Sequence, residues 1–300
     1  MPGLVYVELP ERGVLEVAGE DRVAFLQGLV SNDVTKAGAD RVIFAALLTA
    51  QGRYLFDFFV IALGEALYLE ADAARLPDLQ RRLSLYKLRS KVTLADASRR
   101  FAVAAAFGRD APAALGLSGE GAAKGFAGGI AFVDPRLAAL GLRCVLPREA
   151  GFAALEAAGF ARGDEALYDT HRLALGVPDG SRDLLAEKAL LLESGFDEMN
   201  GIDWQKGCYM GQELTARTKY RALVKKRLLP VRVDGALPPA GTPVMLGNEE
   251  AGELRSGRDG RALALLRLDA VEAAAKGTPL IAGGARVVPE MPAWVRLPEA

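Results

Sequence analysis

Apolar and polar positions in the first hundred residues alternate between strand-like and helix-like spacing. Short apolar runs predict strands, and apolar residues that recur every three or four positions predict helices. The turn Gln51-Gly52 joins two apolar runs and predicts a hairpin. The predicted strands are residues 13–18, 41–49, 53–63, 67–70 and 90–95, and the predicted helices are residues 74–85 and the segment that Glu20-Asp21 opens and Asn32-Asp33 ends. Together they predict an α+β module with antiparallel pairing over residues 1–100.

The middle of the chain repeats this mixture. Residues 108–129 are rich in Gly and Ala with weak periodicity, which predicts loops and short elements. The predicted strands are residues 101–107, 130–133 and 142–146, and the predicted helices are residues 148–158, 164–176 and 212–219. We therefore expect a second α+β module over residues 101–225.

The pattern changes again near residues 223–226, where we place a module boundary. Short apolar runs then alternate with Gly, Pro and Asn turns, as is typical of a small all-β barrel. The predicted strands of this third module, residues 226–300, are residues 227–233, 243–246, 262–268, 279–282 and 285–288. The run at residues 272–276 predicts no more than a helical turn.

Composition limits the kind of partner. Half of the residues are apolar, a quarter are charged, and the formal net charge is −1, so no global attraction to nucleic acid or to an anionic membrane is expected. Cys144 and Cys208, the only cysteines, lie far apart in sequence, which does not suggest a disulfide framework. The chain shows no signal-peptide pattern and no apolar run of about 20 residues. We expect a soluble, cytoplasmic protein.

Cys208 is the strongest candidate for chemistry. It lies between Gly207 and Gly211, two residues that permit positive φ and close backbone approach, and just ahead of a predicted helix. The positive end of the helix dipole and nearby Lys206 would favour the thiolate, so Cys208 is a candidate reactive or ligating cysteine. The alternative is that it is a small buried hydrophobe, and for Cys144, within an apolar strand pattern, core packing is the prediction.

Other chemistry has less support. His171 is the only histidine, so a metal site is not predicted, and a Cys–His hydrolase would need the fold to bring His171 beside Cys208. The chain has no Walker-type loop, no paired Cys-x-x-Cys ligands and no Gly-x-Ser-x-Gly elbow. The region around Cys208 is locally basic, which predicts attraction of a carboxylate-bearing ligand or an acidic partner, or else a solvated helix face.

The motif Lys206-Gly207-Cys208-Tyr209-Met210-Gly211-Gln212-Glu213, continued by Leu-Thr-Ala-Arg-Thr, resembles the signature of the YgfZ-type folate-binding proteins. Those proteins belong to the superfamily of the glycine-cleavage T-protein aminomethyltransferase, and the continuation looks most like the branch of mitochondrial iron–sulfur assembly factors. The resemblance covers nearly the whole chain. Further landmarks are Phe25-Leu26-Gln27-Gly28, Ser31-Asn32-Asp33-Val34, Gln51-Gly52-Arg53, Tyr86-Lys87-Leu88-Arg89-Ser90-Lys91-Val92 and Gly176-Val177-Pro178.

The resemblance implies a ring of interleaved α+β modules around a central pocket for tetrahydrofolate, followed by a C-terminal β-barrel. It implies support of iron–sulfur enzymes, including tRNA-modifying ones, and makes the signature cysteine the functional residue. The residues that carry over to the functional centre are Cys208, Lys206, Gln212 and Glu213. The residues expected at the folate are Glu193, Asp57, Arg172, Tyr209 and Arg217. Glu193 is the first choice, because a carboxylate can accept two N–H bonds from the amino-pyrimidine edge of a pterin.

Our leading hypothesis is a folate-binding accessory factor for iron–sulfur cluster assembly that is more an assembly factor than an enzyme. Cys208 would contact a cluster transiently, and assembly or client proteins would supply the other ligands, since one thiolate cannot hold a cluster alone. The alternative is a folate-dependent aminomethyl or one-carbon transferase. The pair Phe56-Asp57 argues against it, because the T-protein has paired acidic residues at this place. A third alternative is a structural protein with a vestigial ligand pocket.

Overall fold

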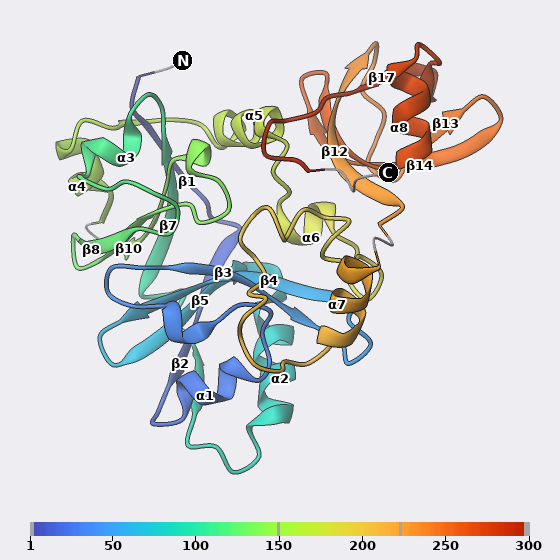
Figure 1. Cartoon of the computed structure of the whole chain (residues 1–300). Helices are drawn as coiled ribbons and strands as arrows, with labels where there is room; N and C mark the ends of the chain where they lie inside the picture. Colours follow the sequence, from blue (N-terminus) through green and yellow to red (C-terminus); the bar gives the residue numbers. More distant parts are fainter. Residues whose placement is uncertain (1–2, 149–150, 222–223, 297–300) are drawn as a thin grey trace. The chain divides into compact units, whose positions relative to one another are not determined.

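The computed structural model describes residues 3–148, 151–221 and 224–296 (Figure 1). The chain forms two compact units, each assembled from separate segments. The first unit is Met1–Thr49, Leu55–Tyr168 and Met199–Met210, and the second is Ala50–Tyr54, Asp169–Glu198 and Gly211–Ala300. Each unit is described by itself below.

One sheet of the first unit contains the predicted hairpin. Its strands follow the order β3-β4-β5-β2-β6. The pairs β4–β5, β5–β2 and β2–β6 are antiparallel. The apolar runs explain the assignment, because the first eight positions of β4 are all buried. The bounds are β2 Arg12–Ala18, β3 Ile43–Leu48, β4 Tyr54–Leu63, β5 Ala66–Asp72 and β6 Thr93–Asp96. The predicted strands of this module are confirmed within a few residues.

Helices cover the core of this sheet. Leu26 of α1 and Leu79 and Leu83 of α2 belong to the same buried cluster as Phe58 and Leu69 of the sheet. The bounds are α1 Arg22–Gln27, η1 Val34–Lys36, η2 Ala73–Arg75 and α2 Leu76–Lys87. The first predicted helix is shorter than expected, because it ends at Gln27 and the chain turns before the single 3₁₀ turn of η1.

The other sheet of the first unit has the order β11-β1-β7-β10-β9-β8, parallel between β1 and β11 and antiparallel elsewhere. The predicted core position of Cys144 is confirmed, because it lies buried in β10 between Ala104 and Ala131. Burial raises the pKa of this thiol to about 12. The bounds are β1 Val5–Glu8, β7 Phe101–Phe107, β8 Ala123–Phe126, β9 Gly129–Val133, β10 Leu142–Pro147, β11 Ala161–Arg162, α3 Ala111–Ala114, η3 Ala138–Leu140 and α4 Gly151–Ala157.

The second unit contains the predicted barrel, which is closed in the order β12-β15-β14-β13-β16-β17. Its core is formed by small and branched apolar residues such as Val231, Leu254 and Leu266. Helix α8 contacts β15 and β17 (Figure 1). The bounds are β12 Lys226–Asp234, β13 Pro243–Leu246, β14 Glu249–Arg258, β15 Arg261–Arg267, β16 Leu280–Ala282, β17 Ala285–Pro289 and α8 Leu268–Ala275.

Two expectations for this region were wrong. Strand β14 was not predicted, because its Gly residues and charged residues hide the apolar alternation, yet it pairs with both β13 and β15. The run at residues 272–276 is the end of the eight-residue helix α8 rather than a single turn. Its buried face, with Ala270 and Val271, begins earlier than the predicted run.

A buried polar network around Arg172 connects α5 and α6 to the barrel strand β14. The Arg172 guanidinium of α5 donates to Asp169, to Asp183 of α6 and to the Ser256 hydroxyl of β14. A charge-assisted network of this kind satisfies groups that would be costly to bury singly. The bounds are α5 Glu165–Leu175, α6 Gly180–Asp183 and α7 Gln212–Tyr220.

The predicted division into modules 1–100, 101–225 and 226–300 stays a prediction. Strand β1, from the first hundred residues, pairs with β7 and β11 of the second sheet. The boundary predicted at residues 223–226 begins at a residue outside the described ones, and β12 starts at Lys226. Among the described residues, none of the helices combines the length and apolar character that a membrane crossing requires.

Candidate functional site

The signature loop is anchored by the side chain of Lys206. Its Nζ donates three hydrogen bonds to backbone carbonyl oxygens, at 2.9 Å to Gln27, 2.6 Å to Val30 and 2.7 Å to Asn32. Gln27 is the last residue of α1, and Val30 and Asn32 follow it, where the chain turns and leaves its carbonyls without helical partners. Three acceptors match the three N–H donors of an ammonium group.

The charge of Lys206 is held inside the protein. The residue is 8% exposed, and burial lowers the pKa of its amine to about 8, although the nearby carboxylates of Asp33 and Asp203 oppose the shift. The amine keeps its proton at pH 7, as its three acceptors require. It also lies 5.2 Å from the centre of the Tyr209 ring, within cation–π range. Lys206 therefore acts first as the anchor of the loop.

Asp203 shapes the backbone just before the motif. Its Oδ1 accepts the N–H groups of Gln205, at 2.7 Å, and Lys206, at 3.0 Å, while Oδ2 pairs with Lys36. Burial would raise the pKa of this carboxyl, but the bonds from Lys36 and the two amides outweigh burial and lower it. An Asp that bonds the amide two residues on is a common way to begin a tight turn.

A second set of bonds fixes the segment that leads into the loop. The Ser31 hydroxyl donates to the Gly201 carbonyl at 2.6 Å, and the Asn32 amide donates to the carbonyls of Phe44 and Asn200, both at 2.7 Å. On the far side of the motif, the Met210 N–H donates to the Gly28 carbonyl at 3.1 Å. The loop is thus held at both ends.

Between these anchors the thiol of Cys208 is exposed, while Tyr209 beside it is buried. The alternative that Cys208 is a buried hydrophobe is therefore wrong. The two glycines that flank it differ. Gly211 has φ +80°, as predicted, whereas Gly207 does not adopt positive φ and has open space where a Cβ would lie.

The predicted helix after the motif is confirmed as α7, which begins at Gln212. It belongs to the second unit, where Leu214 packs against the landmark turn at Gly52: a Cβ added at Gly52 would lie 2.7 Å from the Cβ of Leu214. Glu213 lies in its first turn, and both Glu213 and Arg217 are exposed. The roles predicted for these residues, and the effect of the helix dipole on Cys208, stay predictions.

Glu193, the expected folate contact, lines a cavity of about 190 Å³ in the second unit together with Leu190, Leu228, Leu265 and Lys226. Its carboxylate forms no hydrogen bond or ion pair with any residue that the structure describes. Burial raises its pKa, against the opposing charges of Lys226 and Arg53. The carboxylate is thus a half-buried acceptor that faces a cavity.

Other residues expected at the folate are already engaged. Arg172 uses its guanidinium within the buried network described above. Asp57 is 9% exposed and lies in β4. Burial would lower the pKa of Arg136, but nearby groups raise it above its usual value, Asp134 most strongly and Asp57 to a smaller extent. Both residues therefore have structural roles that the sequence did not suggest.

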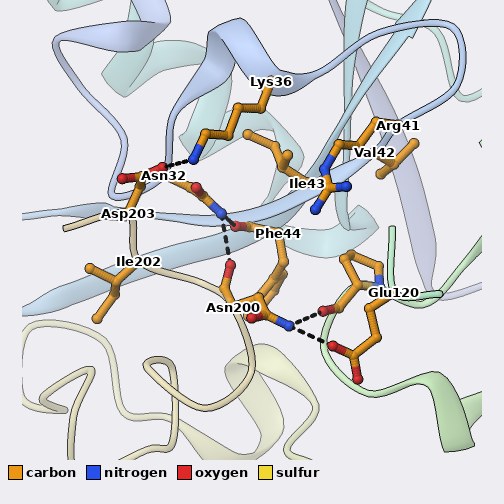
Figure 2. A pocket seen from close by; sticks show the side chains of 11 residues that line it. Asn32, Lys36, Arg41, Val42, Ile43, Phe44, Glu120, Asn200, Ile202 and Asp203 are labelled. Atoms are coloured by element: carbon orange, nitrogen blue, oxygen red, sulfur yellow. Dashed lines mark hydrogen bonds and ion pairs between the residues drawn. The ribbon is translucent and has the colours of Figure 1, made fainter. Parts of the chain in front are cut away.

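Sequence reasoning missed most of the residues around a cavity of about 370 Å³ in the first unit (Figure 2). Asp203 and Asn200 come from the segment before the motif, and Lys36 from η1. An Asp two residues before a polar run, and the pair Asn200-Gly201, were available turn signals. Among the described residues there is no group of three or more His, Cys, Asp or Glu that could hold a metal ion.

Comparison with known proteins gives the class first. Glycine cleavage system aminomethyltransferase T from Bartonella henselae has a TM-score of 0.75 and 16% identity, over 98% of this chain and 86% of that one. A family model described as the CAF17 C-terminal beta-barrel domain matches residues 225–297. The protein thus has the aminomethyltransferase T fold with a C-terminal barrel of this kind, which confirms the predicted fold class.

Sequence relatives then give the family. The iron-sulfur cluster assembly factor IBA57, mitochondrial, of Homo sapiens is 37% identical over 86% of this chain and 76% of its own length. The homolog of Mycosarcoma maydis is 35% identical over 78% of this chain and 59% of its own length. The chain belongs to the IBA57 family, which confirms the resemblance that the signature motif carried.

These comparisons also correct one expectation. The relatives from Homo sapiens, Mus musculus and Mycosarcoma maydis are all named as mitochondrial proteins. The cytoplasmic location predicted from the sequence is therefore wrong, and the relatives point to a mitochondrial one. The prediction rested on the cysteine usage, on the signal-peptide pattern that was looked for and on the length of the apolar runs, and none of these decides where a chain works.

Proposed function

We propose that this protein is an iron–sulfur cluster assembly factor that acts through the thiol of Cys208. The single observation that carries the proposal is an exposed sulfur on a loop whose two ends are fixed by hydrogen bonds, buried ones from the Lys206 side chain and a backbone bond from Met210. The names of its relatives support the same function. A cysteine held in this way is accessible to a partner without rearrangement of the loop.

The cluster is the cargo of this function. One thiolate supplies one of the four cysteine ligands that a cluster ordinarily takes, so an assembly partner or client must supply the others. Cys208 would contact the cluster during transfer between such proteins. Iron–sulfur enzymes that modify tRNA are proposed clients, on the resemblance of the signature motif alone.

We further propose that Glu193 contributes to a folate site. Its unpaired carboxylate can accept the N–H donors of a pterin, and the leucines beside it offer an apolar surface for the ring. The cavity is smaller than the roughly 300 to 1,000 Å³ of most ligand pockets, so it fits a head group rather than a whole folate. Arg172 fits less well, because its donors already serve Asp169, Asp183 and Ser256.

The transferase alternative has weaker support. It was motivated by the shared fold and by Asp57, which lies buried in β4 and adds a smaller contribution than Asp134 to the raised pKa of Arg136. The likeness to aminomethyltransferase T, at 16% identity, concerns the fold alone. Turnover of an aminomethyl or methyl donor with tetrahydrofolate would revive this alternative.

Complementation tests the thiol. A strain that lacks the factor should recover four-iron enzyme activity with the wild type and with Cys144→Ala, but not with Cys208→Ser, whose exposed side chain is replaced at little cost in stability. Recovery by Cys208→Ser equal to that by the wild type would refute the proposal.

Calorimetric titration of tetrahydrofolate tests Glu193 separately. We expect Glu193→Gln to weaken binding at least tenfold and the exposed control Glu272→Gln to leave it unchanged. Equal affinities in all three proteins would remove Glu193 from the folate site without affecting the thiol proposal.

A further inference from the structure

The cavity of about 370 Å³ in the first unit contains charged side chains that neither the signature motif nor the proposed folate contact explains (Figure 2). Its volume is within the usual range for a small-molecule site. Buried apolar residues form part of its wall, and polar side chains complete it. The apolar residues are Val42, Ile43, Phe44, Pro135 and Ile202, and the polar ones are Asn32, Lys36, Arg41, Glu120, Asn200 and Asp203.

Most of the polar groups are already used. Lys36 pairs with Asp203, so their charges cancel. The Asn32 amide donates to two carbonyl groups, and the Asn200 amide donates to Glu120 Oε2 and to the Pro135 carbonyl, both at 2.9 Å. Both N–H donors of each amide are therefore used, and the charge of Lys36 is already paired.

Arg41 and Glu120 are different. The Arg41 side chain forms no hydrogen bond or ion pair within the described part of the chain, and Figure 2 shows its guanidinium turned toward the side of the cavity where Phe44 lies. Among the described residues, the Glu120 carboxylate accepts only from the neutral N–H groups of Asn200 and of Ala138, the latter at 3.2 Å. One positive and one negative charge therefore line the same cavity without pairing with each other.

We propose that this cavity binds a small zwitterion of the amino-acid class, with its carboxylate on Arg41 and its ammonium on Glu120. A guanidinium recognises a carboxylate through two parallel N–H bonds, and a carboxylate is the natural acceptor for an ammonium. A ligand with only one charge would leave the other protein charge uncompensated. The apolar wall favours a short aliphatic segment between the two ends of the ligand.

Such a ligand would act on the loop that carries Cys208. Glu120 holds the side chain of Asn200, and the Asn200 carbonyl accepts from Asn32, the residue whose own carbonyl receives Lys206. A ligand bound at Glu120 would restrict the motion of the segment that these hydrogen bonds hold, from Asn200 to Lys206. The N–H groups of Gln205 and Lys206 donate to Asp203, so their hydrogen exchange measures this restriction directly.

Calorimetric and NMR titration of the full chain tests the proposal with defined probes. Glycine, β-alanine and 4-aminobutyrate vary the distance between the charges, while acetate and methylamine each carry one. We expect one of the zwitterions to bind with a dissociation constant near a millimolar, typical of so small a ligand, and acetate and methylamine to bind at least tenfold more weakly. Hydrogen exchange at Gln205 and Lys206 should slow when the zwitterion binds.

Matched variants locate the site. Arg41→Gln should weaken the zwitterion at least tenfold, and Glu120→Gln should weaken the zwitterion but not acetate. Arg109→Gln, which removes an exposed guanidinium outside the cavity, should change nothing. The proposal is overturned if no zwitterion binds, if acetate binds as well as the best zwitterion, or if Arg41→Gln binds like the wild type. It does not rest on the thiol function, so complementation by Cys208→Ser decides that question independently.

Discussion

Replacement of Lys206 by methionine should release the signature loop while the rest of the first unit stays folded. Methionine keeps the buried aliphatic stem but removes all three N–H donors, so the carbonyls of Gln27, Val30 and Asn32 lose their shared partner. The change therefore isolates the polar anchor from the packing around it.

The expected magnitude follows from the three bonds. A hydrogen bond to a charged group contributes about 1.5–3 kcal/mol net, but returning the ammonium to water recovers part of its desolvation cost. We take about 1 kcal/mol for each bond, or about 3 kcal/mol for the loop. Because about 1.4 kcal/mol is a factor of ten, loop opening should become roughly a hundredfold more frequent.

Hydrogen exchange measures this opening directly. The reporters are the amides of Gln205 and Lys206, bonded to Asp203, and of Met210, bonded to the Gly28 carbonyl. We expect their exchange to accelerate roughly a hundredfold in Lys206→Met, with amides of β7 unchanged. The control Lys124→Met removes an exposed lysine of the same unit and should leave all of them as in the wild type. Exchange within threefold of the wild type in Lys206→Met would refute the anchoring role.

Three further predictions concern acids and strain. Asp203→Ala should lower stability to urea by about 1–2 kcal/mol at pH 7. Because the folded pKa of this carboxyl lies below its usual 3.8, its stabilisation is present above that pH and should fade as the pH falls below it. Glu193 has a raised folded pKa, so its contribution is present at acidic pH and lost as the pH rises. Glu193→Gln should therefore gain urea resistance over the wild type as the pH rises above 4.5, the ordinary pKa of a Glu carboxyl, and equal resistance at every pH would contradict burial of the carboxylate. Leu88 is 90% exposed and has φ +42°, so Leu88→Gly should raise the free energy of unfolding by about 1 kcal/mol. The control Leu85→Gly, within α2, should lower it by about as much. A lower stability in both variants would disprove the strain at residue 88.

The elements that the sequence predicted well are those whose apolar pattern is local. Strand β7 is an uninterrupted apolar run, β4 is apolar except for Asp57, and α7 begins directly after a glycine at positive φ. Strand β14 was missed because its partners, rather than its own residues, make it a strand. Strand β1 was missed for the same reason, since it pairs with β7 and β11, whose residues Phe107 and Ala161 lie opposite Val5 from far along the chain.

The site shows the same division. The motif led directly to Cys208, and its exposure is confirmed. The roles of Lys206 and Asp203 depend on carbonyls and side chains from residues 27–36, about 170 positions earlier, which no local pattern could indicate. Arg172 was expected at the folate because of the family resemblance, and the sequence alone does not distinguish a binding arginine from one held in a buried network.

The contrast between the two sulfurs gives the protein a built-in probe. Cys208 is open to reagents, whereas Cys144 lies fully buried in β10 with its pKa raised to about 12. A maleimide dye added at neutral pH should therefore label the native wild type once, at Cys208, without mutagenesis. The dye would then report the arrival of a partner at the loop, and delayed labelling of the second sulfur would time the global unfolding of the first unit.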